Sequence, residues 1–456
     1  MRACWDGTPG SSFRIVESQL QDVGRSIHAA FPGKSRHPLR ALDERAMQLA
    51  SQDAELRAAL FRFVDVTPAC RSLDDLATHL TGYLEEVDER PPPIEAAMRM
   101  SGTKAGRAAL GAAAAAGVRH MAHRFIVGET PRAALKTIRH LWENGAAVSL
   151  DLLGEATVTE AEADRYAARC LDALETLAEA AGSWPERPVL ETDSLGRLPR
   201  VNLSVKVSAL TPLLRPEAPD VGREDAAHRM RPLLLRAREL GAHLHIDMES
   251  VDTIEATLGL VFELLDEPEL REGPSAGVVM QAYLRESPDQ LQRVIDWASA
   301  TAREQPIVVR LVKGAYWDHE VVDARQHGWT PPVFEDKRES DRNFEALTRL
   351  LLEAWPHVRP AIASHNLRSV AHALAAAREL GREDRDIEFQ VLRGLGDDLA
   401  AALADLGQRV RIYCPVGDMV AGMAYLVRRL LENTSNESFL GEQQRGTPIE
   451  QLLAAP

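Results

Sequence analysis

The stretch VNLSVKVS, residues 201–208, alternates apolar and polar side chains along its whole length. The stretch HLHIDME, residues 243–249, alternates in the same way and carries two histidines and two carboxylates at its polar positions. Successive side chains of a strand point to opposite faces, so each stretch predicts a β-strand with one apolar and one polar face. The sequence therefore predicts strands whose ionisable groups point into the protein.

Short apolar runs alternate with amphipathic helical segments from residue 116 onward, which is typical of parallel β/α units. The predicted strands are residues 121–127, 147–152, 200–206, 242–247, 277–281, 307–311, 361–364 and 387–391. Eight such units predict an α/β protein with a (βα)8 TIM-type barrel at residues 116–440. An open, doubly wound sheet is the alternative.

Residues 1–115 contain helix-like segments and no convincing strand, which predicts an N-terminal helical arm. The predicted helices of the arm are residues 13–30, 38–52, 54–64, 72–86 and 93–100. Residues 441–456 are interpreted as a C-terminal tail. The sequence thus predicts an arm, a barrel and a tail.

The composition favours small-molecule partners. The formal charge is −15 and the Lys and Arg residues form no basic run, which argues against a nucleic-acid partner. The four cysteines show neither CxxC spacing nor a paired framework, which predicts a reducing, cytoplasmic location and no metal site. No run of 18 apolar residues and no signal-peptide core occurs. We expect a soluble protein that is at most peripheral at the inner face of a membrane.

Residues 413–433, YCPVGDMVAGMAYLVRRLLEN, predict a turn followed by a helix, with Asp418 at the helix N-cap. Tyr425 lies three positions before Arg428 and four before Arg429, so a phenol ring and two guanidinium groups emerge close together. This arrangement predicts an anion clamp with an aromatic wall. The alternative is an ordinary solvated helix face, or cations near a helix C-terminus.

Several segments resemble, in order, those of flavin-dependent proline dehydrogenases, in particular the proline dehydrogenase module of bifunctional proline utilization A proteins. The shared motifs are SxKxSAL at residues 204–210, IDxE at 246–249, QAY at 281–283, RLVKGAYWD at 310–318, HN at 365–366, EFQ at 388–390, YxPxG at 413–417, AYLVRRLLEN at 424–433 and SF at 438–439. The resemblance covers roughly residues 120–440. It implies oxidation of L-proline to 1-pyrroline-5-carboxylate by hydride transfer to N5 of FAD, with a membrane quinone as the final acceptor.

The resemblance also implies a substrate site. Its residues are Glu129, Lys206, Asp247, Leu392, Tyr413, Tyr425, Arg428 and Arg429. The two arginines would hold the proline carboxylate as a bidentate fork, and Lys206 would add a third cation. Glu129 would pair with Arg428 as a gate over the substrate. From the residues alone, the alternative is that Lys206 and Asp247 are halves of buried structural ion pairs.

The cofactor residues that the resemblance implies follow the strand ends. They are Gln281, Arg310, Val312, Lys313, Gly314, Ala315, Tyr316, Trp317, Lys337, His365, Asn366, Gln390 and Leu392. Arg310 would lie near flavin N5 and Gln281 near the pyrimidine edge. Lys313 and Gly314 lie past a predicted strand end, where glycine lets the backbone approach a phosphate and lysine supplies charge. No GxGxxG follows an opening strand, so barrel loops would hold the dinucleotide.

One departure from the family concerns the expected cofactor site. Residues 332–337 read PVFEDK where the family commonly has PVYTRK, so Glu335 and Asp336 replace a hydroxyl and a base. If these carboxylates face the FAD phosphates, FAD affinity should be weaker than is usual in the family.

Two other functions remain as hypotheses. A metal-dependent barrel hydrolase is suggested by His243, His245 and Asp247 on one strand face, with His365 ending another strand. A non-enzymatic binding or assembly module with a degenerate barrel is the other. In bifunctional members of the family an aldehyde dehydrogenase module follows the segment that resembles residues 446–456, so such a module is a further expected partner.

We predict that Arg428 and Arg429 bind and orient the substrate and take no part in hydride transfer itself. Arg429→Met should raise KM for proline roughly 10 to 1000-fold, because losing one buried charge-assisted partner costs about 2 to 5 kcal/mol. FAD content should stay normal. Steady-state kinetics of Arg428→Met and Arg429→Met, with proline and with the inhibitor tetrahydrofuroic acid, test this. Unchanged KM and inhibition constants in both variants would place the pair on a solvated helix face.

Overall fold

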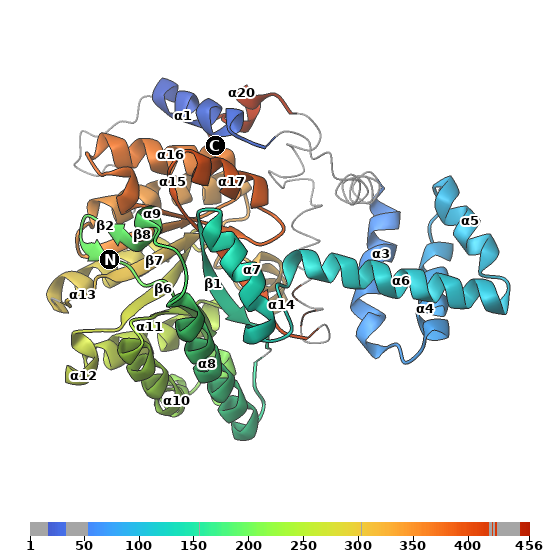
Figure 1. The fold of residues 1–456 in the computed structure, drawn as a ribbon, viewed down its shortest axis with the longest axis horizontal. Helices are drawn as coiled ribbons and strands as arrows, with labels where there is room; N and C mark the ends of the chain where they lie inside the picture. Colours follow the sequence, from blue (N-terminus) through green and yellow to red (C-terminus); the bar gives the residue numbers. More distant parts are fainter. Residues whose placement is uncertain are drawn as a thin grey trace.

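A closed barrel of eight parallel strands forms the centre of the computed structural model (Figure 1). The model describes residues 17–32, 53–154, 156–301, 303–418, 422, 425 and 447–456. The strands are β1 (Ala146–Leu152), β4 (Asn202–Lys206), β5 (His243–Asp247), β6 (Ser275–Gln281), β7 (Ile307–Val312), β8 (Val358–Ala363), β9 (Glu388–Leu392) and β10 (Arg409–Val416). Each strand pairs with the next in this order, and β1 pairs with both β4 and β10. The predicted barrel is confirmed, and the open sheet is wrong.

The first and last strands differ from the prediction. Residues 121–127 are not a strand, because most of them form the C-terminal end of helix α6 (Lys104–Phe125). The predicted eighth strand, residues 387–391, is β9, the seventh strand of the barrel. The eighth is β10, and the sequence predicts a turn at its end, before the helix that carries Tyr425. Pro415 suggested a turn because proline lacks an N–H, but here it lies within β10 and its carbonyl accepts a hydrogen bond from the backbone N–H of Val127 at 3.0 Å.

Helices cover the outside of the barrel (Figure 1). They are α7 (Pro131–Glu143), α8 (Glu160–Ala181), α10 (Pro219–Glu239), α11 (Val251–Asp266), α13 (Ser287–Thr301), α14 (Trp317–Gln326), α15 (Lys337–Glu353), α16 (Leu367–Glu379) and α17 (Asp397–Asp405). Shorter helices are α9 (Pro188–Glu191), α12 (Pro268–Arg271) and α20 (Ile449–Leu452), and β2 (Thr192–Asp193) pairs with β3 (Gly196–Arg197) in a hairpin. None of the helices in the described part of the chain is long and apolar enough to cross a membrane.

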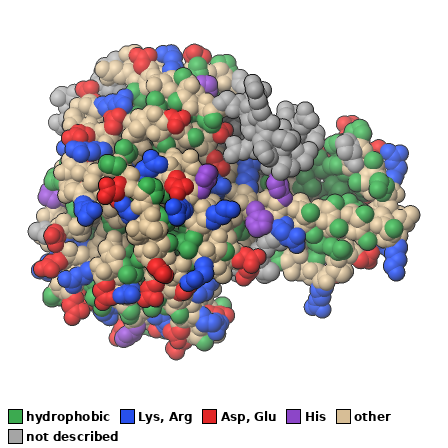
Figure 2. All heavy atoms as spheres, viewed as in Figure 1, with side chains coloured by type: hydrophobic (Ala, Val, Ile, Leu, Met, Phe, Trp, Pro, Cys, Tyr) green, Lys and Arg blue, Asp and Glu red, His purple; other side chains and the backbone are tan. Residues whose placement is uncertain are grey.

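The predicted helical arm projects from the barrel (Figure 1). It consists of α3 (Ala54–Val66), α4 (Leu73–Glu85), α5 (Pro92–Met100) and α6. Figure 2 shows hydrophobic side chains gathered over the arm, whereas acidic and basic side chains are interspersed over the visible face of the barrel. The predicted helix at 38–52 lies outside the described residues. The predicted boundary at residues 115 and 116 falls inside α6, so the division into three parts stays a prediction.

The first predicted helix of the arm belongs to the barrel instead. Helix α1 (Glu17–Ala29) buries Leu20 and Ile27 in the same apolar core as the barrel helices. It lies beside α16 and α20 (Figure 1). Both described ends of the chain therefore meet on one side of the barrel.

Arg368 on α16 holds this junction together. Its guanidinium donates to the Glu17 carboxylate of α1 at 2.5 Å, to the Glu345 carboxylate of α15 at 2.8 Å and to the Leu453 carbonyl at 2.7 Å. The side chain is buried, so these acceptors replace the water that the guanidinium loses.

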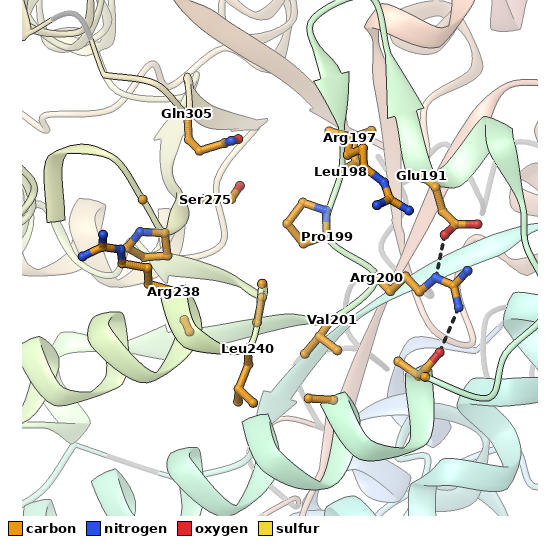
Figure 3. Close-up of a pocket in the computed structure, with 18 of the residues that line it drawn as sticks. Glu191, Arg197, Leu198, Pro199, Arg200, Val201, Arg238, Leu240, Ser275 and Gln305 are labelled. Atoms are coloured by element: carbon orange, nitrogen blue, oxygen red, sulfur yellow. Dashed lines mark hydrogen bonds and ion pairs between the residues drawn. The ribbon is translucent and has the colours of Figure 1, made fainter.

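A cavity of about 570 Å³ lies at the N-terminal ends of β4, β5 and β6 (Figure 3). In its wall, Arg200 donates to the Glu191 carboxylate at 2.5 Å and to the Ala181 carbonyl at 2.9 Å. Catalytic groups of (βα)8 barrels gather at the opposite, C-terminal ends of the strands. This cavity is therefore not the candidate active site.

We predict that Arg368→Met destabilises the protein by about 3 to 5 kcal/mol, because it leaves the Glu17 and Glu345 carboxylates without their shared cation. Denaturant unfolding measures the loss. The matched control is Arg378→Met on the same helix, whose half-exposed pair with Asp384 contributes only about 0 to 1 kcal/mol. Equal losses in the two variants would contradict the role given to Arg368.

Candidate active site

A cavity of about 320 Å³ lies at the C-terminal ends of the strands. The sequence-predicted residues that line it are Lys206, Asp247, Gln281, Arg310, Val312, Lys313, Gly314, Ala315, Tyr316, His365, Gln390, Leu392, Tyr413 and Tyr425. The sequence analysis missed Asp151, Met248, Glu249, Val279, Ala363, Ser364 and Val391. Residues from opposite ends of the sequence thus meet in one cavity, as the barrel requires.

Lys206 lies between two carboxylates. Its Nζ is 2.5 Å from Asp151 Oδ1 and 3.8 Å from Asp247 Oδ2. Burial alone would lower the pKa of Lys206, but Asp151 and Asp247 outweigh burial and raise it above its ordinary value. Lys206 therefore carries a positive charge in the cavity. Asp151 could have been found from sequence, because Ser149 and Asp151 alternate with leucines in β1 as the polar residues of β4 do.

Asp247 uses both carboxylate oxygens. Arg310 Nη1 donates to Oδ1 and the Tyr413 hydroxyl donates to Oδ2, each at 2.6 Å. The guanidinium carbon of Arg310 lies 5.2 Å from the centre of the Tyr413 ring. Burial, followed by the charges of Asp151 and Asp247, raises the pKa of Tyr413 well above 10. Tyr413 is therefore a neutral phenol with a fixed ring.

Arg310 extends across the barrel. Its Nε donates to Gln390 Oε1 at 2.6 Å, and its Nη2 donates to the hydroxyls of Ser204 at 3.2 Å and Ser149 at 3.3 Å. Arg310 is only 4% exposed, so its guanidinium is almost completely enclosed by acceptors from four other strands.

The residues around Gln281 fit a flavin ring. Gln281 Nε2 donates to the Glu249 carbonyl at 3.0 Å, whereas its buried Oε1 has no hydrogen-bond partner among the described residues. The pyrimidine edge of a flavin presents an N–H donor, which such an acceptor would satisfy. Gly314 has φ +137°, and a Cβ there would lie 2.4 Å from the Tyr283 ring. The glycine lets the backbone pass close along this side of the cavity.

The two lysines expected near phosphates share one carboxylate. Lys313 Nζ pairs with Asp341 Oδ1, and Lys337 Nζ lies 2.9 Å from Asp341 Oδ2. Burial lowers the pKa of Lys313 despite the opposing effect of Asp341. Lys337 does not line the cavity. Their role toward a phosphate stays a prediction.

Other predicted site residues lie away from the cavity. Glu129 is exposed, and Trp317 donates its ring N–H to the Phe334 carbonyl at 2.9 Å. The Asn366 side chain accepts from the Ser369 backbone N–H at 3.0 Å and so caps α16. None of these three lines the cavity. Their assigned roles stay predictions.

The predicted clamp is only partly described. Arg428 and Arg429 lie outside the described residues. Gly422 and Tyr425 are helical, and the Gly422 N–H donates to the Asp418 carbonyl at 3.0 Å, as expected of a helix that begins at Asp418.

The two acidic departures make local contacts. Glu335 pairs with Arg325 at 2.6 Å near the surface. Asp336 accepts from the Arg338 backbone N–H at 2.8 Å and caps α15. Asp336 stands where the family commonly has a base, and in this chain its carboxylate is the N-cap of α15. Neither side chain lines the cavity.

The geometry does not support the metal-dependent hydrolase. His243 contacts Ser275 Oγ at 2.8 Å and His245 Nδ1 at 3.0 Å, while Asp247 binds Arg310 and Tyr413. The histidines therefore face each other and not the carboxylate. Across the described ranges, no group of three or more His, Cys, Asp or Glu side chains is arranged to hold a metal ion.

A parallel barrel with paired charges and aromatic rings at the C-terminal ends of its strands is the architecture of a (βα)8-barrel enzyme. Residues 134–442 match the family model "Proline dehydrogenase", and residues 17–125 match "Proline utilization A N-terminal domain". The chain belongs to the proline dehydrogenase family.

Individual relatives agree with this assignment. The bifunctional protein PutA of Salmonella typhimurium is 36% identical over 350 residues, which are 74% of this chain and 25% of PutA. Proline dehydrogenase 1 of Bacillus subtilis is 28% identical over 72% of this chain and 92% of its own length. The structure of proline utilization A from Bdellovibrio bacteriovorus inactivated by N-propargylglycine matches with a TM-score of 0.87 at 36% identity, over 96% of this chain and 44% of that one. The chain thus spans about a quarter of the length of the curated PutA relatives.

We predict a stability loss at mildly acidic pH that depends on His243. Burial, followed by the charge of Arg411, lowers the pKa of His243 from 6.5 to about 3. Below pH 6.5 this histidine is protonated in the unfolded chain and neutral in the folded chain. Each pH unit of acidification should therefore lower the free energy of unfolding by ~1.4 kcal/mol for this residue.

Denaturant unfolding between pH ~6.5 and ~5 should therefore show a slope that is shallower by this amount in His243→Gln. The control is His228→Gln, which changes an exposed histidine and should keep the wild-type slope. If His243→Gln kept that slope too, His243 would not be neutral in the folded protein.

Proposed function

We propose that the chain oxidises L-proline to 1-pyrroline-5-carboxylate with FAD as the bound electron acceptor. The observation that carries this proposal is the cavity whose wall contains two features: Asp247 joins Arg310 and Tyr413 by hydrogen bonds, and the Gln281 side-chain oxygen is an acceptor without a partner among the described residues. Membership of the proline dehydrogenase family supports the same reaction.

The residues of the cavity bind and orient the substrate. Lys206, held in place by Asp151, supplies a positive charge for the proline carboxylate, and Arg428 and Arg429 add the clamp that the sequence predicts. Tyr413 and Tyr425 provide aromatic walls that exclude water from the substrate ring. The flavin, when bound, supplies the acceptor for the hydride.

The side chains in the wall of the cavity are held in fixed positions, which suits the removal of a hydride from proline. Removing a hydride from carbon requires that the substrate ring be held in one orientation against the acceptor. The Tyr413 ring cannot swing away without breaking its hydrogen bond to Asp247, which Arg310 holds in turn. The charged and aromatic walls of the cavity are therefore set before the substrate enters.

We further propose that the electrons pass to a membrane quinone and that the protein acts in the cytoplasm, with peripheral contact at the inner face of the membrane. An aldehyde dehydrogenase module is a proposed partner, because several curated relatives are named bifunctional. The proposed parts are an arm at 1–115, the barrel at 116–440 and a tail at 441–456.

We predict that the protein, purified and supplied with FAD, takes up the flavin non-covalently and is bleached by L-proline without oxygen or nicotinamide. Lys206→Met should raise KM for proline about 30 to 4000-fold, because a buried charge partner of a carboxylate contributes about 2 to 5 kcal/mol. The control is Lys136→Met, which removes an exposed lysine from α7. The proposed function would be contradicted if the protein took up no flavin, or if the bound flavin stayed oxidised after proline was added.

A further inference from the structure

Glu388 is a buried carboxylate deep in the barrel that does not line the cavity. It begins β9, and Gln390 follows two positions later on the same face of the strand. Arg411 of β10 binds Glu388 through Nε at 2.9 Å and through Nη2 at 3.0 Å. A third Arg411 donor, Nη1, reaches the Val148 carbonyl of β1 at 3.0 Å. Glu388 is thus held in one position by a guanidinium that is itself fixed.

The Gln390 amide has only one possible orientation between its neighbours. Its Nε2 donates to Glu388 Oε1 and its Oε1 accepts from Arg310 Nε, both at 2.6 Å. A guanidinium has donors only, and an ionised carboxylate has acceptors only. A flipped Gln390 amide would place its NH₂ group against the N–H of Arg310 and its oxygen against the carboxylate of Glu388, so both hydrogen bonds would be lost. Glu388 therefore decides which atom of Gln390 faces Arg310.

We propose that Glu388 is a positioning residue for the active site, acting through Gln390 on Arg310. Arg310 in turn binds Asp247, which holds the Tyr413 hydroxyl. The path runs from the interior of the barrel to the cavity wall through four hydrogen bonds of 2.6 Å. Each of these bonds has at least one charged partner, which makes it stronger and more directional than a neutral one.

The ionised state of Glu388 is consistent with this role. Burial alone would raise its pKa, but the charges of Arg411 and Arg409 outweigh burial and lower the pKa of Glu388 to about 2. Glu388 is therefore ionised, and accepts hydrogen bonds only, at neutral pH.

The test is a double-mutant cycle on the full chain, built from Glu388→Gln, Gln390→Leu and the double variant. The measured quantities are the FAD dissociation constant of the apoprotein and the midpoint potential of the bound flavin. A Gln side chain at 388 presents oxygen or NH₂ equally well, so Gln390 loses its fixed orientation. Glu388→Gln should weaken FAD binding about tenfold, which is ~1.4 kcal/mol. It should also make the potential more negative, because a loosened Arg310 stabilises the reduced flavin less.

In the Gln390→Leu background, the change at 388 should alter the FAD dissociation constant less than twofold and should leave the midpoint potential unchanged, as expected of residues that act through one another. Effects that simply add would show that Glu388 does not act through Gln390 and would overturn the inference. Should Glu388→Gln fail to fold, Glu388→Asp replaces it, because Asp keeps the charge beside Arg411 but is too short to reach Gln390.

The matched control is Asp193→Asn. Asp193 is also a buried carboxylate paired with a strand arginine, but it binds Arg359 near the N-terminal end of the barrel. Asp193→Asn should lower stability without shifting the flavin potential. A shift equal to that of Glu388→Gln would reduce Glu388 to a general electrostatic role.

The inference rests on the proposed function, because its measurements use bound flavin. The two fail differently. A wild-type chain that binds no FAD contradicts the proposed function and the inference together. A wild-type chain that binds FAD and oxidises proline, with Glu388→Gln unchanged in both measurements, contradicts the inference alone.

Discussion

A guanidinium buried inside a closed barrel must find acceptors for all its donors, because water cannot enter to supply them. Arg310 comes close to this state in the middle of the barrel, where Asp247, Gln390 and two serines accept from four of its five N–H groups. Most (βα)8 barrels fill this space with branched apolar side chains. Here the filling is polar, so the identity and orientation of each interior residue follow from the need to pair its neighbours. A pair of this kind contributes modest net stability, but losing one partner is costly.

The need to pair buried charges also accounts for features far from the cavity. Arg359 and Arg409 enter the barrel near its N-terminal end, and the hairpin of β2 and β3 delivers Asp193 to both, at 2.8 Å and 3.8 Å. The Asp193 side chain is completely buried, although it belongs to a hairpin of two-residue strands. The short hairpin therefore supplies a counter-charge to the core. Together with Glu388, it allows a row of arginines to remain inside the barrel without unpaired charge.

Periodicity in the sequence revealed those parts of the fold whose local pattern is unambiguous. The alternation in residues 201–208 and 243–249 identified β4 and β5 and their inward polar groups correctly. It failed for residues 121–127, because a short apolar run at the end of a helix has the same composition as a buried strand. It also missed β10, where Pro415 carried more weight than the alternation of Val410, Ile412 and Cys414 with polar neighbours. The partners of Arg310 could not be predicted, because they depend on the register of strands that lie far apart in sequence.

The segment that leaves the arm runs beside the strand that carries Tyr413. After α6 ends at Phe125, the chain runs beside the end of β10, where Val127 donates to the Pro415 carbonyl and Gly417 donates to the Gly128 carbonyl, each at 3.0 Å. β10 is the strand that carries Tyr413. The apolar core of the arm includes Ile126 and Tyr425, and Tyr425 also lines the cavity. The arm is thus packed against the wall of the site, and a displacement of α6 would have to move the segment that supports Tyr413 and Tyr425.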